Sequence, residues 1–516
     1  MEKSLFKINA EGINNSNLQQ DNNENISSSI EETAITSKKE SINVETIVDD
    51  TSLNFAVSSD TEKVDVIQQE ATDNTSTDKA ETTNSEKKME EDSIHVIFGD
   101  KLIEVLNLKF FNNNLYAFSD GKYNIVTDKF LRSCILKYIY KNANLNLRKN
   151  IIAYVNDILY DEDAIFEINK DYINFKNGLY DLKNKQFIEH TPKVFSINQV
   201  HVNYISDFKA NNEVVNNYLD EITNYVPERK QALLQTMGYS LTTRNNIQKF
   251  FIWYGPSASN GKSTLAKIIV RIIGPENVSH KDMQTLSRQF GANGIQDKLL
   301  NIVSELPINK VKDTAVLKNT ISGDAFETDV KFAGGTDITS YVKHIFTANT
   351  LPQVADNTDG FYRKVNILLF DNKFDVKTST FDVDEFMSQE NLDYLANLAL
   401  REYLKMISSN NLEFANQEES DKLLQDYRKE NDTVVSFLTD ADTVLTIYNC
   451  DVVRASMFNL YKSYCSRNKF IPLGQHAFFR ALRENYGFAE KPINNGTQIA
   501  FFREKPIFDN LETNNI

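Results

Sequence analysis

The stretch that decides the fold runs from Lys249 to Gly274 and reads KFFIWY-GPSASNGKST-LAKIIVRIIG. An apolar strand leads into a loop of small residues, and the loop opens a helix that has an apolar face. In this context backbone N–H groups converge on phosphates at the N-terminus of a helix. We therefore predict a nucleotide-binding loop between Tyr254 and Leu265.

The residues of this loop have distinct expected roles. Gly261 leaves room for a phosphate beside the backbone. Lys262 is expected to pair with the β- and γ-phosphates, and the hydroxyl of Ser263 to hold Mg²⁺. ATP and Mg²⁺ are therefore the expected cofactors. The residues expected to bind them are Gly255, Asn260, Gly261, Lys262, Ser263 and Thr264.

The spacing of the glycines departs from the standard pattern, which has four residues between its first glycine and the Gly-Lys pair. Gly255 and Gly261 enclose five residues. Either Pro256 replaces the first glycine, or the loop is one residue longer. The alternative interpretation of the whole segment is an ordinary strand-to-helix turn with a solvent-facing lysine.

Three residues beside downstream apolar strands complete the predicted site. Glu305 follows the strand candidate 299–304 directly, where a carboxylate can act on Mg²⁺ or polarise water. Asn349 ends the strand candidate 343–348, a position that faces the ligand crevice in an open α/β sheet. Arg363 precedes a further strand, and an arginine that reaches a neighbour's nucleotide neutralises transition-state charge. Taken singly, these residues are equally typical of a cap, a turn and a surface ion pair.

In order and spacing these segments resemble the superfamily 3 helicase core of phage and plasmid primase-helicases and of the poxvirus NTPase-primase. The family has an Arg-Arg pair where this chain has Arg363-Lys364, so Arg363 is the one matching arginine. The resemblance implies an α/β, P-loop, AAA+-like core and an ATP-dependent DNA helicase for replicating a phage, plasmid or mobile element. The matching segments are Asn260–Thr264, Ser304-Glu305, Lys318–Asp324, Phe346–Asn349 and Arg363-Lys364.

The resemblance also implies a ring, expected to be a homo-hexamer, with ATP between subunits and Arg363 acting on the adjoining one. Each subunit would line the pore with a hairpin formed by 327–333, a Gly334-Gly335 turn and 336–338. Lys331 would then contact single-stranded DNA, giving salt-sensitive, non-specific binding. A surface hairpin with an incidental lysine is the alternative. Replication-fork or origin DNA is the expected nucleic-acid partner.

The segments outside the core also carry signals. A hairpin is expected around an Asn177-Gly178 turn, and helical spacing over 213–243 places Val215 and Ile222 on one face. Near the C-terminus, a predicted helix carries Arg480 and Arg483 one turn apart, which suits a recognition helix on DNA. Members of the family end in a winged-helix-like domain, which also implies DNA binding by this helix. Such domains bind proteins as well, so replisome proteins are the alternative partner.

The net charge of −16 is concentrated in the first part of the chain. Residues 1–95 hold 21 acidic and 8 basic residues, and the rest holds 51 and 48. The polar tail has only two aromatic residues and is expected to be disordered. The nearly neutral body does not exclude DNA binding, because a few cations lining a channel suffice.

No apolar run is long enough to span a membrane, and the three cysteines are too scattered for a zinc or disulfide framework. We therefore expect a cytoplasmic setting without a membrane partner. The expected domains are an acidic tail (1–92), an α+β domain (93–235), the ATPase (236–375), a helical lid or linker (376–430) and a winged-helix-like domain (431–516).

Two other functions fit part of the pattern. An initiator or adaptor would bind DNA and partner proteins without processive unwinding, and a small-molecule kinase would lack the pore hairpin and the arginine. Priming requires clustered metal-binding acids, and the region before the ATPase offers only Asp161-Glu162-Asp163, which is typical of a solvated turn. Primase activity is therefore not expected.

Overall fold

The structure is a computed structural model, and every residue it describes belongs to the second of two compact units, Asp60–Ile516. The described residues are 84–160, 170–209, 211–257, 259–288, 290–306, 311–330, 334–374, 383–409, 412–448, 450–494, 496 and 498–504.

A parallel five-stranded sheet forms the centre of the fold, in the order β13-β7-β12-β9-β8. All four strands expected downstream of Gln248 are present, and β8 is added at the edge. Numbered along the chain, the strands lie in the order 5-1-4-3-2, so β12 separates β7 from β9. The strands are β7 (Phe250–Tyr254), β8 (Val278–Ser279), β9 (Leu300–Val303), β12 (Lys343–Ala348) and β13 (Val365–Leu369).

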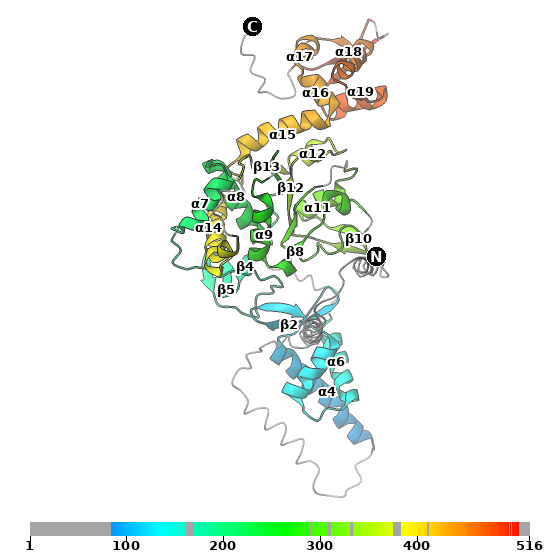
Figure 1. Ribbon diagram of the computed structural model, residues 1–516. Helices are drawn as coiled ribbons and strands as arrows, with labels where there is room; N and C mark the ends of the chain where they lie inside the picture. Colours follow the sequence, from blue (N-terminus) through cyan, green and yellow to red (C-terminus); the bar gives the residue numbers. More distant parts are fainter. Residues whose placement is uncertain are drawn as a thin grey trace, which may run out of the picture. The chain divides into compact units, whose positions relative to one another are not determined.

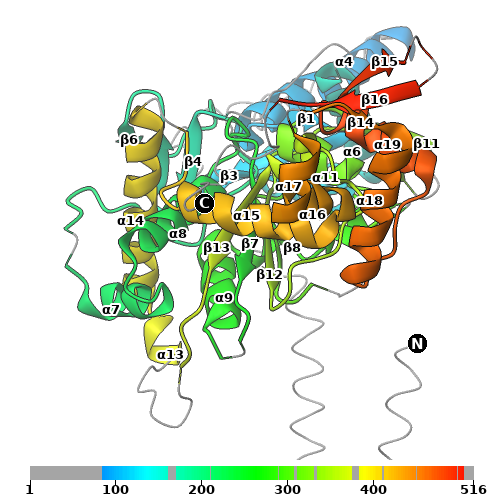
Figure 2. The same ribbon diagram turned by 90° about the horizontal axis from the view of Figure 1, so that it is seen from above.

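Helices cover both faces of this sheet because alternate strand residues point to opposite sides. Phe251 and Trp253 of β7 join one apolar core, whereas Phe250 and Ile252 join another. Figures 1 and 2 show α8, α9 and α14 on one side of the sheet and α11 on the other. The first layer contains α7 (Glu213–Ile222), α8 (Pro227–Ser240), α9 (Lys262–Ile273) and α14 (Gln389–Ser408); the second contains α10 (Met283–Leu286), α11 (Ala315–Ser322), α12 (Asp359–Tyr362) and α15 (Gln417–Asn431).

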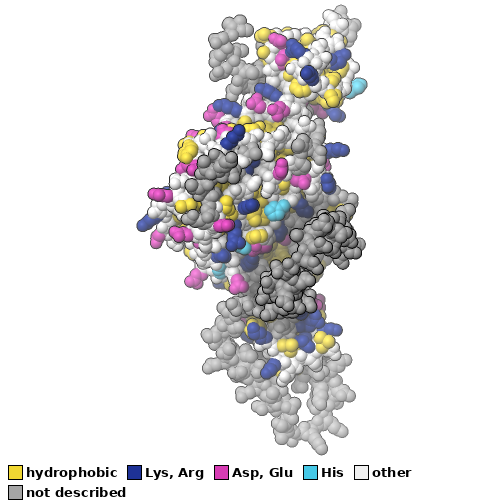
Figure 3. Space-filling view, in the orientation of Figure 1, with side chains coloured by type: hydrophobic (Ala, Val, Ile, Leu, Met, Phe, Trp, Pro, Cys, Tyr) yellow, Lys and Arg dark blue, Asp and Glu magenta, His cyan; other side chains and the backbone are white. Residues whose placement is uncertain are grey.

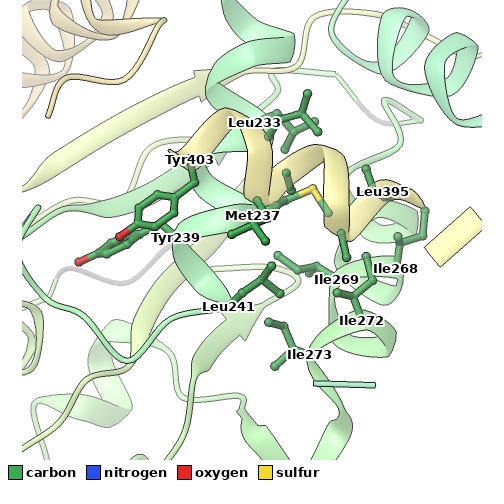
Figure 4. Packing of buried hydrophobic residues seen from close by; sticks show 14 of the residues in the cluster. Leu233, Met237, Tyr239, Leu241, Ile268, Ile269, Ile272, Ile273, Leu395 and Tyr403 are labelled. Atoms are coloured by element: carbon green, nitrogen blue, oxygen red, sulfur yellow. The ribbon is translucent and has the colours of Figure 1, made fainter. Parts of the chain in front are cut away.

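The helical pair α8 and α14 crosses the expected domain boundaries. The boundary between 235 and 236 falls inside α8, and α14 was expected to belong to a separate lid. Figure 4 shows Met237 of α8, Ile269 of α9 and Leu395 of α14 gathered in one apolar cluster. The expected division was wrong here, because periodicity identifies an apolar face but not the element against which it packs.

Upstream of the sheet, the chain is ordered from an earlier point than expected. α4 (Asn84–Leu106) overlaps the expected tail at 84–92, where Glu and Lys are frequent and both favour helices. α4 is followed by β1 (Lys109–Phe111), β2 (Asn114–Ser119), β3 (Lys122–Ile125), α5 (Asp128–Cys134), a π-helix (Ile135–Ile139) and α6 (Leu145–Leu159).

The hairpin expected near Asn177 is present, with β4 (Tyr172–Phe175) antiparallel to β5 (Gly178–Asp181). Phe175 pairs with Gly178, so the two turn residues are Lys176 and Asn177 and not Asn177 and Gly178. A side chain at Gly178 would meet the carbonyl of Ile188, on the neighbouring strand β6 (Gln186–Ile188), at 2.6 Å. Close packing against β6 therefore explains this glycine.

The second expected hairpin is formed by β10 (Phe326–Val330) and β11 (Gly334–Ile338), which pair antiparallel. Gly334 and Gly335 belong to β11, paired with Val330 and Asp329, so the predicted Gly-Gly turn was wrong. A pairing pattern fixes the register of a hairpin, whereas a glycine pair alone does not. Lys331 lies outside the described residues.

The last part of the described chain has its own apolar core, which includes Phe437, Tyr461, Phe478 and Phe501. Its three strands are ordered β14-β16-β15 and pair antiparallel. The elements are α16 (Thr433–Thr439), α17 (Ala441–Ile447), β14 (Val452–Val453), α18 (Arg454–Arg467), α19 (Gln475–Glu484), β15 (Ala489–Ile493) and β16 (Gln498–Phe502).

Within the described ranges, no helix has both the length and the apolar character needed to cross a bilayer. Cys134, Cys450 and Cys465 are all free thiols.

Gly238 sets how closely α8 approaches α14. A Cβ at this position would lie 2.7 Å from Cβ of Tyr403 and against the backbone of Ala399. We expect Gly238→Ala to lower the free energy of unfolding by about 1–3 kcal/mol, because overpacking outweighs the better helix propensity. Denaturant titration measures this change.

Gly360→Ala is the matched control, because the nearest atom to its added Cβ is 3.6 Å away, an ordinary contact. We expect the control to change stability by no more than about 0.5 kcal/mol. A Gly238→Ala protein as stable as Gly360→Ala would contradict the close packing of α8 on α14.

Candidate nucleotide-binding site

The loop between β7 and α9 closes tightly over the end of the sheet. The backbone N–H of Gly255 donates to the Ala348 carbonyl at 3.0 Å, which ties the loop to β12. A Cβ on Gly255 would lie 2.6 Å from the backbone carbonyl oxygen of Phe370, so this position excludes a side chain. This requirement favours Gly255 as the first glycine of the pattern and hence the longer loop.

Gly261 makes the turn from the loop into α9. Its φ of +81° lies in the left-handed region, which glycine adopts at little cost. α9 begins at the next residue, so the N–H groups of Lys262, Ser263 and Thr264 lie in its first turn, where no preceding helical carbonyl can accept them. Ser263 is exposed and Thr264 is half-buried.

Lys262 is buried among neutral oxygen acceptors. Its Nζ donates to the Gly255 carbonyl at 3.2 Å, to Oδ1 of Asn260 at 2.9 Å and to Oδ1 of Asn349 at 3.1 Å. Burial lowers the pKa of Lys262 to about 8, since a desolvated ammonium is disfavoured. The site therefore holds a cation that an anionic ligand would stabilise.

Asn260 holds the loop in this conformation. Its Nδ2 donates to the Ser257 carbonyl at 2.6 Å and to the Phe370 carbonyl at 3.3 Å. Because its Oδ1 also accepts from Lys262, this single side chain connects the loop, the lysine and the end of β13.

Glu305 and Asn349 lie at the same edge of the sheet as the loop. Phe346 of β12 pairs with Val303 of β9, and the Leu306 N–H donates to the Thr347 carbonyl at 3.2 Å, so the alignment continues past Glu305. The Glu305 side chain is exposed. The structure thus brings together the expected lysine and asparagine in direct contact, and places the glutamate on the adjoining strand end.

Arg363 lies at the opposite edge. It precedes β13, whose first residue Val365 pairs with Phe250, the first residue of β7. The five-residue strand therefore separates it from the loop of its own chain by roughly 16 Å. Arg363 is exposed. It is thus not buried within its own subunit, and it lies at the end of β13 opposite the loop.

Lys364, where the family has its second arginine, is buried. Its Nζ donates to Oγ of Ser322 at 2.6 Å, and burial lowers its pKa. Lys364 therefore connects α11 to β13, and its position is unsuited to reaching another subunit.

The sequence analysis missed two ion-pair groups, of which the first lies beside the loop. Arg229 of α8 contacts Asp371, directly after β13, and Glu419 of α15. Lys318 contacts Asp356 at 2.8 Å. Burial acts to raise the pKa of Asp356, but hydrogen bonds from Lys318, Thr314 and Thr358 outweigh it and lower the pKa to about 2. The position of Asp371 at a strand's C-terminal end was the one available signal.

Arg480 and Arg483 lie one turn apart on α19, as expected, and both are exposed. Arg483 also donates to Oε1 of Glu490 on β15 at 2.8 Å. On the face shown in Figure 3, basic and acidic side chains are interspersed. In the parts of the chain that the structure describes, no group of three or more His, Cys, Asp or Glu side chains could hold a metal, and Asp161-Glu162-Asp163 lies outside those parts.

The burial of Lys262 predicts a pH-dependent stability. A lysine whose pKa falls from 10.5 to about 8 on folding destabilises the fold at pH 7, and this effect is lost as pH rises from about 8 to 10.5. We expect Lys262→Met to raise the free energy of unfolding at pH 7 by up to about 3 kcal/mol. Denaturant titrations at pH 7 and pH 10 measure the difference, which shrinks at the higher pH. A less stable variant at pH 7 would show that the three hydrogen bonds outweigh desolvation.

Two family models match parts of the chain, each covering less than half of it. A family described as D5 N terminal like matches residues 62–224, and a family of unknown function, DUF5906, matches residues 253–364. The second match extends from β7 to Lys364 and so contains the whole candidate site.

Curated relatives are viral proteins named as helicases. The chain is 22% identical over 261 residues to a putative helicase of Acanthamoeba polyphaga mimivirus, covering 48% of this chain and 27% of that protein. It is 23% identical over 233 residues to a putative helicase of Invertebrate iridescent virus 6, covering 42% and 24%. The chain therefore spans about a quarter of the length of these relatives.

Among solved structures, the chain is similar to the C-terminal region of NrS-1, with a TM-score of 0.45 and 14% identity, covering 78% of this chain and 98% of that one. A second structure of that region gives a TM-score of 0.44 and 12% identity. These scores are too low to establish a common fold. The sequence matches, by contrast, support kinship with D5-like and helicase-named viral proteins.

Proposed function

We propose that this chain is an ATP-driven DNA helicase or translocase of the superfamily 3 type, acting in replication of a phage, plasmid or other mobile element. The D5-like segment and the names of the viral relatives support a replication-associated helicase function, without specifying the superfamily or the mechanism. The observation that carries the proposal is the contact between Lys262, at the start of α9, and Asn349, directly after β12. Glu305 follows the neighbouring parallel strand β9.

In the proposed mechanism, the triphosphate replaces the neutral acceptors of Lys262. The N–H groups in the first turn of α9 bind its oxygens, and Lys262 pairs with the β- and γ-phosphates. Asn349, already in contact with Lys262, senses the γ-phosphate. Glu305 orients and polarises the attacking water.

The donors at this edge suit Mg²⁺, a hard cation that prefers oxygen ligands. Ser263 offers an exposed hydroxyl at the start of α9, and Glu305 offers an exposed carboxylate. When bound, Mg²⁺ would neutralise charge on the phosphate oxygens.

Arg363 is proposed to act on the nucleotide of an adjoining subunit. Its exposure, and its position at the sheet edge opposite the loop, support this role, because the length of β13 separates it from the loop of its own chain. A ring of identical subunits, proposed to be a hexamer, would place each Arg363 beside a neighbour's ATP. The hairpin of β10 and β11 would contact single-stranded DNA in the pore.

The C-terminal elements follow the order helix-strand-helix-helix-strand-strand from α17 to β16, which is the order of a winged helix. Arg480 and Arg483, both exposed on α19, are proposed to contact fork or origin DNA, and replisome proteins are the alternative partner. A DNA-binding unit beside an ATPase also fits the rival function, an initiator or adaptor that does not unwind processively.

The proposal predicts MgATP hydrolysis that single-stranded DNA accelerates. We expect Lys262→Ala to abolish hydrolysis and ATP-dependent strand displacement, because the phosphates lose their cation, while circular dichroism stays unchanged. Steady-state turnover with and without DNA, and displacement of a labelled strand, measure both activities. Turnover without displacement would favour the initiator or adaptor, and full turnover by the variant would refute the assigned lysine.

The action of Arg363 across subunits predicts complementation. We expect Arg363→Ala and Lys262→Ala proteins to be inactive alone and partly active when mixed. In a mixed ring, an intact loop from one variant meets an intact arginine from the other. MgATP turnover across mixing ratios tests this, with each variant mixed with itself as the control. If activity appears only when a variant is mixed with wild-type protein, and not when the two variants are mixed, Arg363 does not act on the nucleotide of an adjoining subunit.

A further inference from the structure

We propose that Arg229 is a positioning residue that holds the nucleotide loop in its binding conformation and couples it to α15. This inference rests on the proposed function, since it assigns a regulatory link to the same ATP site. The three charged side chains concerned, Arg229, Asp371 and Glu419, are called the Arg229 node.

The Arg229 node is an ion-pair group that joins three distant segments through one buried arginine and two partly exposed carboxylates. The Arg229 side chain is 7% exposed. Its Nε donates to Oε2 of Glu419 at 2.9 Å and its Nη2 to Oε1 at 2.6 Å, which is a bidentate contact. Its Nη1 donates to Oδ1 of Asp371 at 2.8 Å. Because the guanidinium itself is buried, losing a carboxylate partner leaves its charge less compensated, which favours keeping the three segments in contact.

The Asp371 arm of the node reaches the nucleotide loop directly. Asp371 follows Phe370, whose carbonyl accepts from Asn260. Three residues further on, the Phe374 N–H donates to the Ser259 carbonyl at 2.8 Å. A side chain on Gly261 would lie 3.1 Å from the Phe374 ring. The segment 370–374 therefore packs along the loop, and Arg229 binds this segment through Asp371.

The Glu419 arm reaches α15, the helix that leads to the C-terminal elements. Near Glu419, Oγ of Ser420 accepts from the Ile367 N–H at 2.9 Å, and Nδ2 of Asn416 donates to the Ile367 carbonyl at 2.8 Å. The start of α15 is thus attached to β13. At its other end α15 is followed by Asp432, which caps α16.

The consequence is a mechanical link between phosphate binding and α15. When a triphosphate enters the loop, the hydrogen bond from Lys262 to Oδ1 of Asn260 must break or reorient. The Nδ2 of the same Asn260 side chain donates to the Phe370 carbonyl, so a change at one end of the amide affects the other. Arg229 transmits that strain to Glu419 because its planar guanidinium binds both carboxylates in a fixed geometry. Arg229 contacts no nucleotide itself.

The test compares Arg229→Met with Arg244→Met. Arg244 follows the other end of α8 and pairs with a single carboxylate, that of Asp171, at 2.8 Å. Replacing it by Met removes the same charge and the same volume as Arg229→Met. We expect Arg229→Met to raise KM for MgATP by at least about tenfold with kcat changed less than about threefold, because loop preorganisation affects binding. Arg244→Met should leave both within about twofold.

Two milder variants separate the arms and guard against misfolding. Asp371→Asn weakens the loop arm and is expected to raise KM. Glu419→Gln weakens the helix arm and is expected to leave KM near the wild-type value. In the wild type we expect MgATP to slow hydrogen exchange at residues 417–420, and Glu419→Gln should abolish this effect. Arg229→Lys, which keeps the charge but not the bidentate geometry, should recover part of the lost affinity.

Hydrogen exchange without nucleotide gives a readout that does not depend on ATP. Arg229→Met and Asp371→Asn should accelerate exchange of the Phe374 amide, whereas Arg244→Met should not. If the wild type does not turn over MgATP, the proposed function fails while this measurement still decides the structural link. If the Arg229 and Arg244 variants are alike in exchange at 370–374 and in KM, the inference is overturned and the proposed function stands.

Discussion

Lys262 donates to a carbonyl at the end of one strand and to a side chain beyond the end of its neighbour, and these two bonds require β7 and β12 to run parallel side by side. Parallel pairing aligns all carboxyl ends at one edge of the sheet. Glu305 on the next strand joins the same edge for the same reason. The candidate site is therefore a product of the sheet, and its residues need not be close in sequence.

The ammonium group of Lys262 is buried, and none of the acceptors that it contacts is a carboxylate. The three acceptors of Lys262 are neutral oxygens, and burial lowers its pKa to about 8. Burying a charge without a counter-charge costs stability. An anion bound beside Lys262 would offset that cost. A salt bridge at this position would stabilise the fold and compete with the phosphate.

The helical layer beside the loop is assembled from segments before and after the central sheet. α7 and α8 precede the sheet and α14 follows it, yet they share one apolar core with α9. Ile222, the last residue of α7, lies beside Gly261. This layer also supplies Arg229, so the parts of the chain outside the recognisable motifs determine how rigidly the loop is held.

The sequence by itself determined the local elements of the site. Continuous apolar runs predicted β7, β9, β12 and β13, and a period of 3.6 residues predicted the apolar face of α7, because backbone geometry fixes which residues share a face. The glycines and the Gly-Lys-Ser order predicted a tight loop before a helix, because few residues tolerate the left-handed conformation of Gly261.

Only the tertiary structure decided which of these elements meet. The approach of α14 to α8 and the turn positions of both hairpins depend on packing and register between segments that no local pattern encodes. Arg229 lies 142 residues from Asp371 and 190 from Glu419, so their pairing leaves no periodic signal. The strand order likewise placed Arg363 at the far edge, because parallel strands separate the residues before them from the residues after them.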